Sequence, residues 1–321
     1  MRVLALLLTA LATIAAAPYH PGLIRLTVQD TEPFETFIWY PTETPEAENR
    51  IGPFPIHATL GAPVAADRTF PLVLFSHDSG GSPLLHRDLA ASLARAGFIV
   101  VAPIQIGDST GHTEGRAAGR QLMDRPRQAI LALNAALADP RLALRVDPAR
   151  IGMIGYSAGG YTTLVLAGAR PDFALAASYC QAHPEDHGSC GDGSPHARHA
   201  GLLAWQPPVE PRLKAIVLID PLAIVFDAHA LAAVHVPALL LRPTDNSHQG
   251  AEANAGAVAA GLVPPPELVV VPGAHFVFVD PCPPALLAQA PAVCIDAQGV
   301  DRAAIHRQIE TQIAAFLHRT L

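Results

Sequence analysis

The chain has 321 residues, of which 50% are hydrophobic and 15% charged, and its net charge at pH 7 is −7. This composition excludes intrinsic disorder for the body of the chain, because disorder requires low hydrophobicity and high net charge. The 21 basic residues form no concentrated run, which argues against a nucleic-acid-binding surface. Length allows one or two domains. The 31 prolines, roughly twice the usual share, indicate short elements joined by stiff loops.

The first seventeen residues have the layout of a secretory signal peptide. Arg2 precedes a nearly unbroken hydrophobic stretch from Val3 to Ala12, and small residues at 15–17 precede Pro18. This segment is too short to span a membrane stably, and no other stretch reaches the roughly 18 consecutive apolar residues that a span needs. We therefore expect residues 1–17 to be removed, leaving a soluble protein that is secreted or periplasmic.

The rest of the chain predicts strands alternating with helices. Two β-rich runs, Leu23 to Val28 and Thr36 to Tyr40, indicate an antiparallel pair, and residues 41–70 indicate an extended loop. The continuous apolar runs that follow are typical of strands buried on both faces of a parallel sheet. Such strands are expected at 71–76, 98–102, 151–156, 215–219, 238–241 and 268–271.

Helices are expected between these strands. Leu85, Leu89 and Leu93 recur every fourth residue, so residues 84–96 should be helical. Pro126 suits the first turn of a helix that would run from 126 to 138. Further helices are expected at 161–169 and 301–318. This alternation implies an α/β fold, with a mainly parallel sheet covered by helices on both faces.

Residues 178–212 break the periodicity, and we interpret them as a cap-like insertion in a single domain of residues 18–321. Four cysteines allow three disulfide connectivities. Local pairing is the economical choice in an exported protein, so we predict Cys180–Cys190 and Cys282–Cys294. A zinc site is disfavoured because neither pair has zinc-knuckle spacing, and the sequence predicts no metal and no cofactor.

The segment Gly155-Tyr156-Ser157-Ala158-Gly159-Gly160 carries the strongest functional signal. A G-x-S-x-G motif alone occurs in many chains. Here it follows a predicted strand and precedes a predicted helix, which is the context of a nucleophile elbow. The small flanking residues permit the strained turn that lifts the serine hydroxyl above the sheet. We therefore predict that Ser157 is a nucleophile.

A serine nucleophile requires a base to remove its proton. When the triad order is Ser, acid, His, the histidine comes last, after a strand. His275 fits this position because it lies in a Gly-containing loop after the 268–271 strand. His306 and His318 fall in the terminal helix, where they are expected to be solvated. His248 precedes the last strand and fits less well.

Two aspartates compete for the acid. Asp245 follows the penultimate strand and Asp220 ends the strand before it. Either could reach His275 from the carboxyl edge of the sheet. We prefer Asp245 and keep Asp220 as the alternative. For the oxyanion hole, which needs two backbone donors, we predict the N–H of Ala158 and that of Ser79.

Together, these residues resemble the α/β-hydrolase superfamily. More narrowly, the chain is similar to secreted bacterial proteins labelled predicted dienelactone hydrolases and to the secreted platelet-activating-factor acetylhydrolases. The resemblance extends over the mature chain. It implies the α/β-hydrolase fold and ester hydrolysis by a Ser-His-Asp triad without a cofactor. The matching segments are 75–81, 155–160, 219–221, 273–276 and the tail around Cys282 and Cys294.

Two departures restrict what the resemblance implies. The family usually has glycine where this chain has Asp78. Aspartate tolerates left-handed backbone better than most residues, but its carboxylate would oppose an oxyanion. The founding dienelactone hydrolases use a cysteine nucleophile, whereas this chain has Ser157, so their substrate is not carried over. In the acetylhydrolases the acid lies at a strand end like that of Asp220, which weakens the preference for Asp245.

The sequence therefore predicts a secreted carboxylic ester hydrolase that acts on a small-molecule or lipid-like ester through an acyl-enzyme. Three alternatives remain open. The first is a serine peptidase, because the same triad cleaves amides. The second is a polyester or lipid hydrolase with an apolar groove shaped by residues 178–212. The third is an inactive binding protein on the same fold, for which Asp78 is the only support.

Overall fold

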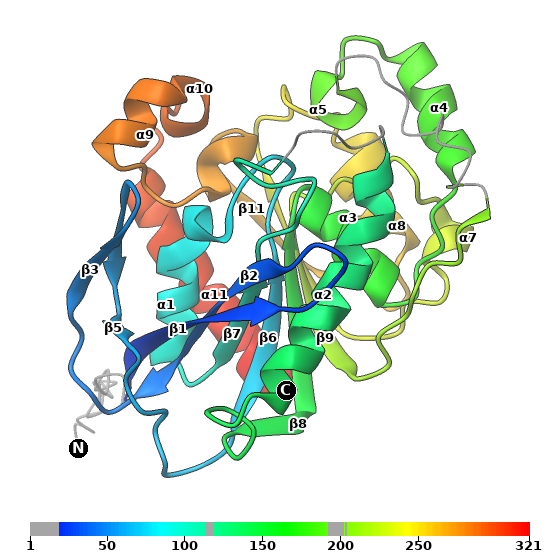
Figure 1. The fold of residues 1–321 in the computed structure, drawn as a ribbon. Coiled ribbons are helices and arrows are strands. Elements are labelled where there is room, and N and C mark those ends of the chain that lie inside the picture. The colour runs from blue at the N-terminus through cyan, green and yellow to red at the C-terminus, as the bar shows by residue number, and fades with distance from the viewer. Residues whose placement is uncertain (1–18, 113–118, 192–201, 203) are drawn as a thin grey trace, which may run out of the picture.

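The computed structural model describes residues 19–112, 119–191, 202 and 204–321. The expected signal peptide lies outside the described residues, and so does part of the expected cap. Within the described residues, the central feature is a nine-stranded sheet in the order β11-β10-β9-β8-β6-β7-β2-β1-β5 (Figure 1). The strands from β6 to β11 are parallel to one another, and β2 joins β7 in antiparallel pairing.

The strands extend somewhat beyond the predicted apolar runs. The antiparallel N-terminal pair is confirmed, with Leu23 opposite Trp39. The bounds are β1 His20–Val28, β2 Phe34–Thr42, β5 Thr59–Leu60, β6 Phe70–Ser76, β7 Ile99–Pro103, β8 Val146–Tyr156, β9 Leu213–Ile219, β10 Ala238–Pro243 and β11 Glu267–Val271.

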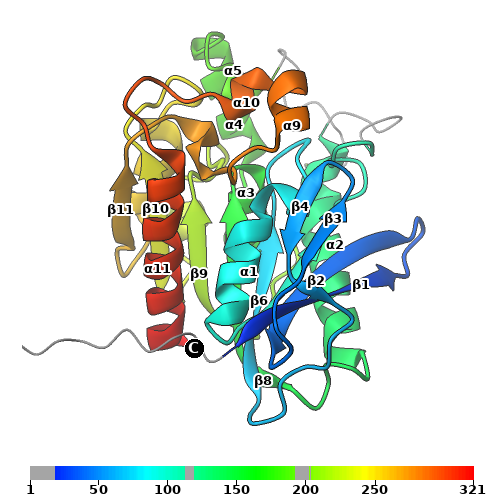
Figure 2. The same ribbon diagram turned by 90° about the vertical axis from the view of Figure 1, so that its left-hand side faces the viewer.

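Helices cover both faces of the sheet. On one face, α1 (Arg87–Arg95) and α11 (Arg302–Thr320) pack with η4 (His275–Phe278), and Figure 2 shows α1 and α11 in front of the strands. On the other face lie α2 (Arg120–Ala138), α3 (Ala158–Leu166), α7 (Ala228–Leu231) and α8 (Ala257–Gly261). The predicted α/β architecture is confirmed: parallel strands buried on both faces read as continuous apolar runs.

The loop predicted for residues 41–70 is wrong in part. It contains a hairpin of β3 (Glu48–Ile51) and β4 (Phe54–His57) as well as the short edge strand β5. These strands are only two to four residues long and their faces are mixed in burial. The period-two pattern was therefore too short to stand out against the surrounding prolines and glycines.

Pro126 does not begin its helix, because α2 starts six residues earlier, at Arg120. A proline inside a helix leaves the carbonyl four residues before it without a helical donor. Here that carbonyl belongs to Leu122, and it accepts a hydrogen bond of 3.1 Å from the hydroxyl of Tyr161 on α3. The helix therefore continues through the proline because a neighbouring helix supplies the missing donor.

Two disulfides join the predicted local pairs, Cys180 to Cys190 and Cys282 to Cys294. The first links α4 (Phe173–Ala182) to α5 (His187–Cys190), and the second closes a loop around α9 (Pro284–Gln289) and α10 (Pro291–Cys294). Both views place α5 and α10 at the same end of the molecule (Figures 1 and 2).

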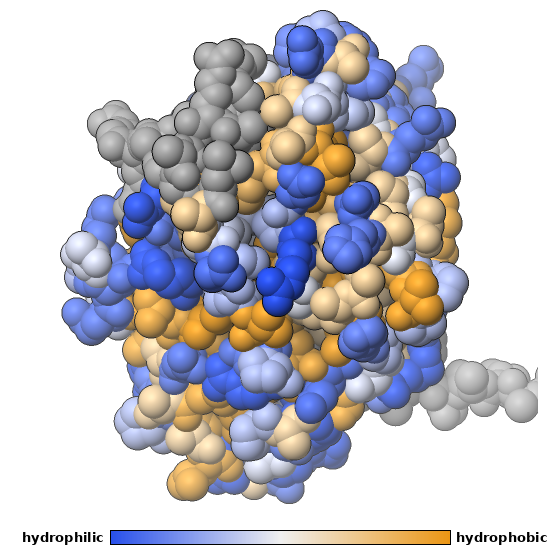
Figure 3. Space-filling view, turned by 90° about the vertical axis from the view of Figure 1, so that its right-hand side faces the viewer, coloured by the Kyte–Doolittle hydropathy of each residue, from blue (hydrophilic) through white to orange (hydrophobic). Residues whose placement is uncertain are grey.

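No helix in the described part of the chain is long and apolar enough to cross a membrane. The face shown in Figure 3, which is the right-hand side of Figure 1, intersperses hydrophilic and hydrophobic residues, with a hydrophobic band across its middle. Such mixing is ordinary, because apolar atoms contribute more than half of the accessible surface of folded proteins.

Candidate active site

Ser157 occupies a sharp turn between β8 and α3. Its backbone angles are φ +54° and ψ −117°, a strained combination for a residue with a side chain. The turn is possible because its neighbours are small. A Cβ atom on Gly159 would overlap the carbonyl of Ser76, and one on Gly160 would overlap Pro221. The glycines thus let the turn sit directly against the adjacent strand ends.

Asp220 lies beside this turn because β9 pairs with β8. Tyr156 is opposite Ile219 in the parallel register, and the N–H of Ser157 donates to the carbonyl of Ile219 at 3.0 Å. Asp220 also has a positive φ, +37°. Ser157 and Asp220 are the only non-glycine residues with positive φ among those described. Such strain persists where surrounding structure enforces it and clusters at functional sites.

His275 is the first residue of η4, shortly after β11 ends. Its Nδ1 lies 2.6 Å from Oδ2 of Asp220, and both residues are buried, at 2% and 3% exposed. Because the ionised carboxylate can only accept, this contact places the imidazole proton on Nδ1. The other ring nitrogen, Nε2, is then left with a lone pair able to take a proton.

The structure does not bring Asp245, the preferred acid, into contact with His275. The exposed carboxylate of Asp245 accepts from the N–H of Ser247 at 2.9 Å, so it caps its own loop. The alternative, Asp220, makes the contact with His275.

The expectation that His306 is solvated is wrong, because its Nε2 is 2.9 Å from the carbonyl of Val277 and the residue is 4% exposed.

Ser157 and His275 are not hydrogen-bonded to each other within the described structure. Asp220 connects them in space, because it follows the strand residue paired with the one before Ser157 and its carboxylate contacts His275. Nucleophile–base hydrogen bonds are often long without substrate and shorten when it binds.

The imidazole of His275 lies between two other rings. Tyr156 stacks on it with centroids 4.9 Å apart, and the Tyr156 hydroxyl donates to the backbone carbonyl of His275 at 3.0 Å. Full burial keeps the pKa of Tyr156 well above its ordinary value, so this hydroxyl stays a donor. His248 stacks at 4.2 Å with an interplanar angle of 20°.

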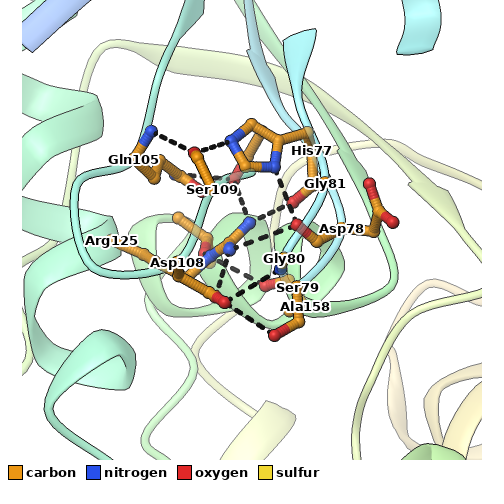
Figure 4. Close-up of polar contacts among 12 residues, drawn as sticks. His77, Asp78, Ser79, Gly80, Gly81, Gln105, Asp108, Ser109, Arg125 and Ala158 are labelled. Carbon is orange, nitrogen blue, oxygen red and sulfur yellow. Dashed lines mark hydrogen bonds and ion pairs between the residues drawn. The ribbon is translucent and has the colours of Figure 1, made fainter. Parts of the chain in front are cut away.

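The loop after β6 is held by a buried ion pair, which Figure 4 shows in close-up. The carboxylate of Asp108 accepts from the hydroxyl of Ser79 at 2.7 Å and from the N–H of Gly80 at 3.0 Å. Its other oxygen pairs with Arg125, whose guanidinium also donates to the carbonyl of His77. Because charge-assisted hydrogen bonds are strong and directional, this network fixes the backbone of the loop.

His77 completes the support of this loop as a neutral imidazole. Burial, together with the charge of Arg125, lowers the pKa of His77 to about 4. Its Nδ1 therefore donates to the carbonyl of Asp78 at 2.7 Å, while Nε2 accepts from the hydroxyl of Ser109 at 2.9 Å. That hydroxyl in turn accepts from the N–H of Gln105, which leaves the chain of hydrogen bonds fully paired.

The two predicted oxyanion donors, Ala158 and Ser79, lie close to this network. Ala158 is the first residue of α3, so its N–H has no partner within the helix. The N–H of Ser79 has no backbone acceptor among the described residues. Ala158 and Ser79 appear together in Figure 4, next to the Asp108–Arg125 pair.

Asp78 does not adopt the left-handed backbone conformation that an aspartate at this position would tolerate. The positive φ of +68° falls on Gly80 instead. The carboxylate of Asp78 points away from Asp108 and Arg125 (Figure 4), and it fills the space where a Cβ on Gly81 would stand. Burial opposes ionisation, yet His86, His77 and His275 together hold the pKa of Asp78 below its ordinary value. His86 contributes most to this lowering of the Asp78 pKa, and its Nε2 lies 3.8 Å from Oδ1.

A pocket of about 600 Å³ flanks His248 on the side of α4 and α5. Its lining includes Tyr179, the carboxylates of Glu185, Asp186 and Glu252, and, from the loop that carries His248, Asn246, Ser247 and Gly250. Among the described residues, no group of three or more His, Cys, Asp or Glu side chains is placed to hold a metal ion.

Sequence reasoning identifies neither Asp108 nor Arg125, and it considers His248 only as a less suitable base. Asp108 could have been considered from its position shortly after a buried strand, at the same sheet edge as Ser157. No comparable signal marks Arg125, which lies in the middle of a helix, or His248, whose loop shows no periodicity.

Comparisons with known proteins support this assignment of fold. A family model for the dienelactone hydrolase family matches residues 56–192, from the β3–β4 hairpin to beyond the Ser157 turn. A search of curated proteins found no match.

Solved structures provide longer matches. A ferulic acid esterase from Streptomyces cinnamoneus is 19% identical, with a TM-score of 0.59 over 97% of this chain and 92% of that one. A dienelactone hydrolase from Anabaena variabilis is 14% identical, with a TM-score of 0.50 over 94% and 100%. An acylaminoacyl peptidase from Pyrococcus horikoshii is 14% identical, with a TM-score of 0.52 over 95% of this chain and 42% of the peptidase. The chain therefore has the α/β-hydrolase fold, and its residues 56–192 are similar to the dienelactone hydrolase family.

Proposed function

We propose that this protein is a secreted serine hydrolase that cleaves carboxylic esters with the triad Ser157, His275 and Asp220. The observation that carries the proposal is the 2.6 Å contact between the buried His275 and Asp220, beside a serine held at φ +54°. This combination matches the roles of a base oriented by an acid and a nucleophile raised on a strained turn.

In the proposed reaction, Ser157 Oγ attacks the ester carbonyl carbon while His275 Nε2 takes the hydroxyl proton. Asp220 stabilises the imidazolium that results. The N–H groups of Ala158 and Ser79 stabilise the oxyanion. When the tetrahedral intermediate collapses, the alcohol departs with the proton from His275, and water then hydrolyses the acyl-enzyme by the same steps.

The ion pair below the β6 loop explains how Ser79 could be ready for this role. Asp108 accepts from the Ser79 hydroxyl and from the Gly80 N–H, and Arg125 holds the Asp108 carboxylate, so the donor would not need to reorganise when charge develops. Preorganised donors of this kind account for about 2.7–4 kcal/mol of barrier lowering each. Asp78 would disfavour a second negative charge close by, and so we expect neutral esters to be better substrates than anionic ones.

Export is part of the proposal. It is supported by the two disulfides, since such bonds persist in oxidising compartments, and by the leader-like sequence of residues 1–17. Mass spectrometry of the N-terminus after expression with export would test it, and a chain that still begins at Met1 would contradict it.

The test of activity compares the wild type with Ser157→Ala on p-nitrophenyl esters of increasing acyl length. Methyl ferulate belongs in the panel because of the similarity in fold to an esterase for such acids. Wild-type turnover that is lost in Ser157→Ala, together with fluorophosphonate labelling lost in the same variant, is expected. Full turnover in Ser157→Ala would refute the proposal.

The same panel separates the remaining alternatives. A rate that rises with acyl length up to long chains would identify a lipid or polyester hydrolase. Cleavage of p-nitroanilide peptides at rates matching the esters would identify a peptidase. An enzyme that neither turns over any ester nor reacts with fluorophosphonate would be a binding protein on this fold.

A further inference from the structure

The ring of His248 contacts the imidazole of His275 and has no part in the proposed mechanism. It stacks almost parallel on the imidazole, with centroids 4.2 Å apart and 20° between the planes. On the opposite side, Tyr156 stacks at 4.9 Å and 28°. The imidazole of His275 is therefore held between two flat rings, while Asp220 fixes its Nδ1 edge.

The backbone around His248 is anchored by the disulfide-linked α5 turn. The carbonyl of His248 accepts from the N–H of Gly188 at 3.0 Å, and Asp186 accepts from the N–H of Gly250 at 2.8 Å. A Cβ on Gly188 would overlap the His248 carbonyl, so glycine is what permits this approach. Cys190, at the end of the same turn, is bonded to Cys180 on α4.

The next residue along connects this segment to the acid. The side-chain amide of Gln249 donates to the carbonyl of Asp220 at 3.0 Å, and Gln249 is 3% exposed. Phe276 packs on the other edge of the His248 ring, with centroids 4.8 Å apart. The backbone of His248 is thus tied to the α5 turn directly and to Asp220 through Gln249.

His248 is neutral at physiological pH. Burial, with a contribution from the nearby charge of His275, lowers the pKa of His248 to about 4, although Asp220, Asp186 and Asp78 act in the opposite direction. A neutral aromatic ring attracts a cation placed over its face. A second cation in the same place would instead repel it.

We propose that His248 is a positioning residue, which keeps the His275 ring aligned between itself and Tyr156 and stabilises the imidazolium that forms as Ser157 loses its proton. The role in proton transfer rests on the proposed function. The stacking and its effect on the protonation of His275 do not depend on it.

The test replaces His248 with residues that fill the same space with and without an aromatic face. His248→Phe keeps a ring over His275, and His248→Leu keeps comparable packing but has no π face. Ser247→Ala is the matched control, because this exposed neighbour contributes only its backbone N–H to a hydrogen bond. Thermal unfolding of each variant establishes that it is folded.

The first readout is steady-state hydrolysis of p-nitrophenyl acetate. We expect kcat of His248→Phe and Ser247→Ala within about threefold of the wild type. His248→Leu should lose kcat by on the order of tenfold, the size of a desolvated cation–π contact, with KM nearly unchanged. Equal kcat in the Phe and Leu variants would overturn the inference. If both variants lose kcat equally, the ring nitrogens of His248 and not its aromatic face account for its effect.

The second readout needs no substrate. Nuclear magnetic resonance of histidine-labelled protein follows the protonation of His275, whose other charged or titratable neighbours are Asp220, Asp78 and Tyr156. The pKa of His275 should be lower in His248→Leu than in His248→Phe by roughly 0.5 to 1 pH unit. Identical values would overturn the inference. If the wild type fails to hydrolyse any ester, the proposed function falls, and this comparison still decides the role of His248.

Discussion

Replacing Asp220 by Asn would remove the buried negative charge beside His275 and keep the size of the side chain. The carboxylate oxygen is 2.6 Å from Nδ1, so in the imidazolium state the two charge centres lie about 4 Å apart. At an effective dielectric constant near 20, their attraction is about 4 kcal/mol, which corresponds to about 10³ in rate. The amide can also donate to Nδ1 and impose the wrong tautomer, which raises the expected loss of kcat to about 10³–10⁴.

The assay is hydrolysis of p-nitrophenyl acetate by wild type, Asp220→Asn and Asp245→Asn, with circular dichroism to establish that each is folded. Asp245 is exposed and caps its own loop, so Asp245→Asn should stay within about twofold of the wild type, as surface substitutions do. The reasoning is refuted if Asp245→Asn loses more activity than Asp220→Asn, or if both variants keep wild-type turnover.

Three predictions concern stability. Tyr161→Phe should leave the buried carbonyl of Leu122 unpaired and lower the free energy of unfolding in urea by about 1–3 kcal/mol; an unchanged midpoint would contradict this. Burial, reinforced by neighbouring carboxylates, raises the pKa of Glu310 from 4.5 to about 7. Folding therefore favours its protonated form, so the stability it contributes is present below pH 4.5 and lost as pH rises through about 7. Glu310→Gln should flatten this part of the profile of Tm against pH, and a profile identical to the wild type would exclude the effect. Replacing Cys282 and Cys294 together by Ser opens a loop with a sequence separation of 12 and should cost about 3 kcal/mol; unfolding under reducing conditions provides the control, since there the two proteins should differ little.

The turn that carries Ser157 was predictable because its signal is local. The strand, the G-x-S-x-G turn and the helix are contiguous, and the glycines at 155, 159 and 160 are required by contacts that any such turn makes. The parallel sheet was predictable for the same reason, since burial on both faces leaves a continuous apolar run.

Which aspartate contacts His275 was not decidable from spacing, because Asp220 and Asp245 both follow strands that end at the same edge. What separates them is the use of each side chain. Asp245 satisfies the N–H of Ser247, whereas Asp220 is held at a positive φ that directs it toward His275. That difference lies in backbone conformation, which a single sequence does not reveal.

The supporting residues were harder still, because they meet from separate parts of the chain. Asp108 and Arg125 come from a loop and a helix 17 positions apart, and His248 reaches His275 only through the folded α5 turn. Each is an ordinary polar residue until the tertiary structure brings it to the site.

The pairing of Tyr156 with Ile219 has a consequence for how this protein could diversify. Since Ser157 and Asp220 continue directly from paired strands, their separation is inherited from the spacing of a β-sheet, about 4.8 Å between neighbouring strands. Insertions in the surrounding loops would leave that spacing intact. The histidine, in contrast, arrives on a loop and depends on its neighbours for alignment. Loops that carry none of these three residues are therefore open to change toward new substrates, whereas changes that reach the η4 turn would endanger the proposed chemistry itself.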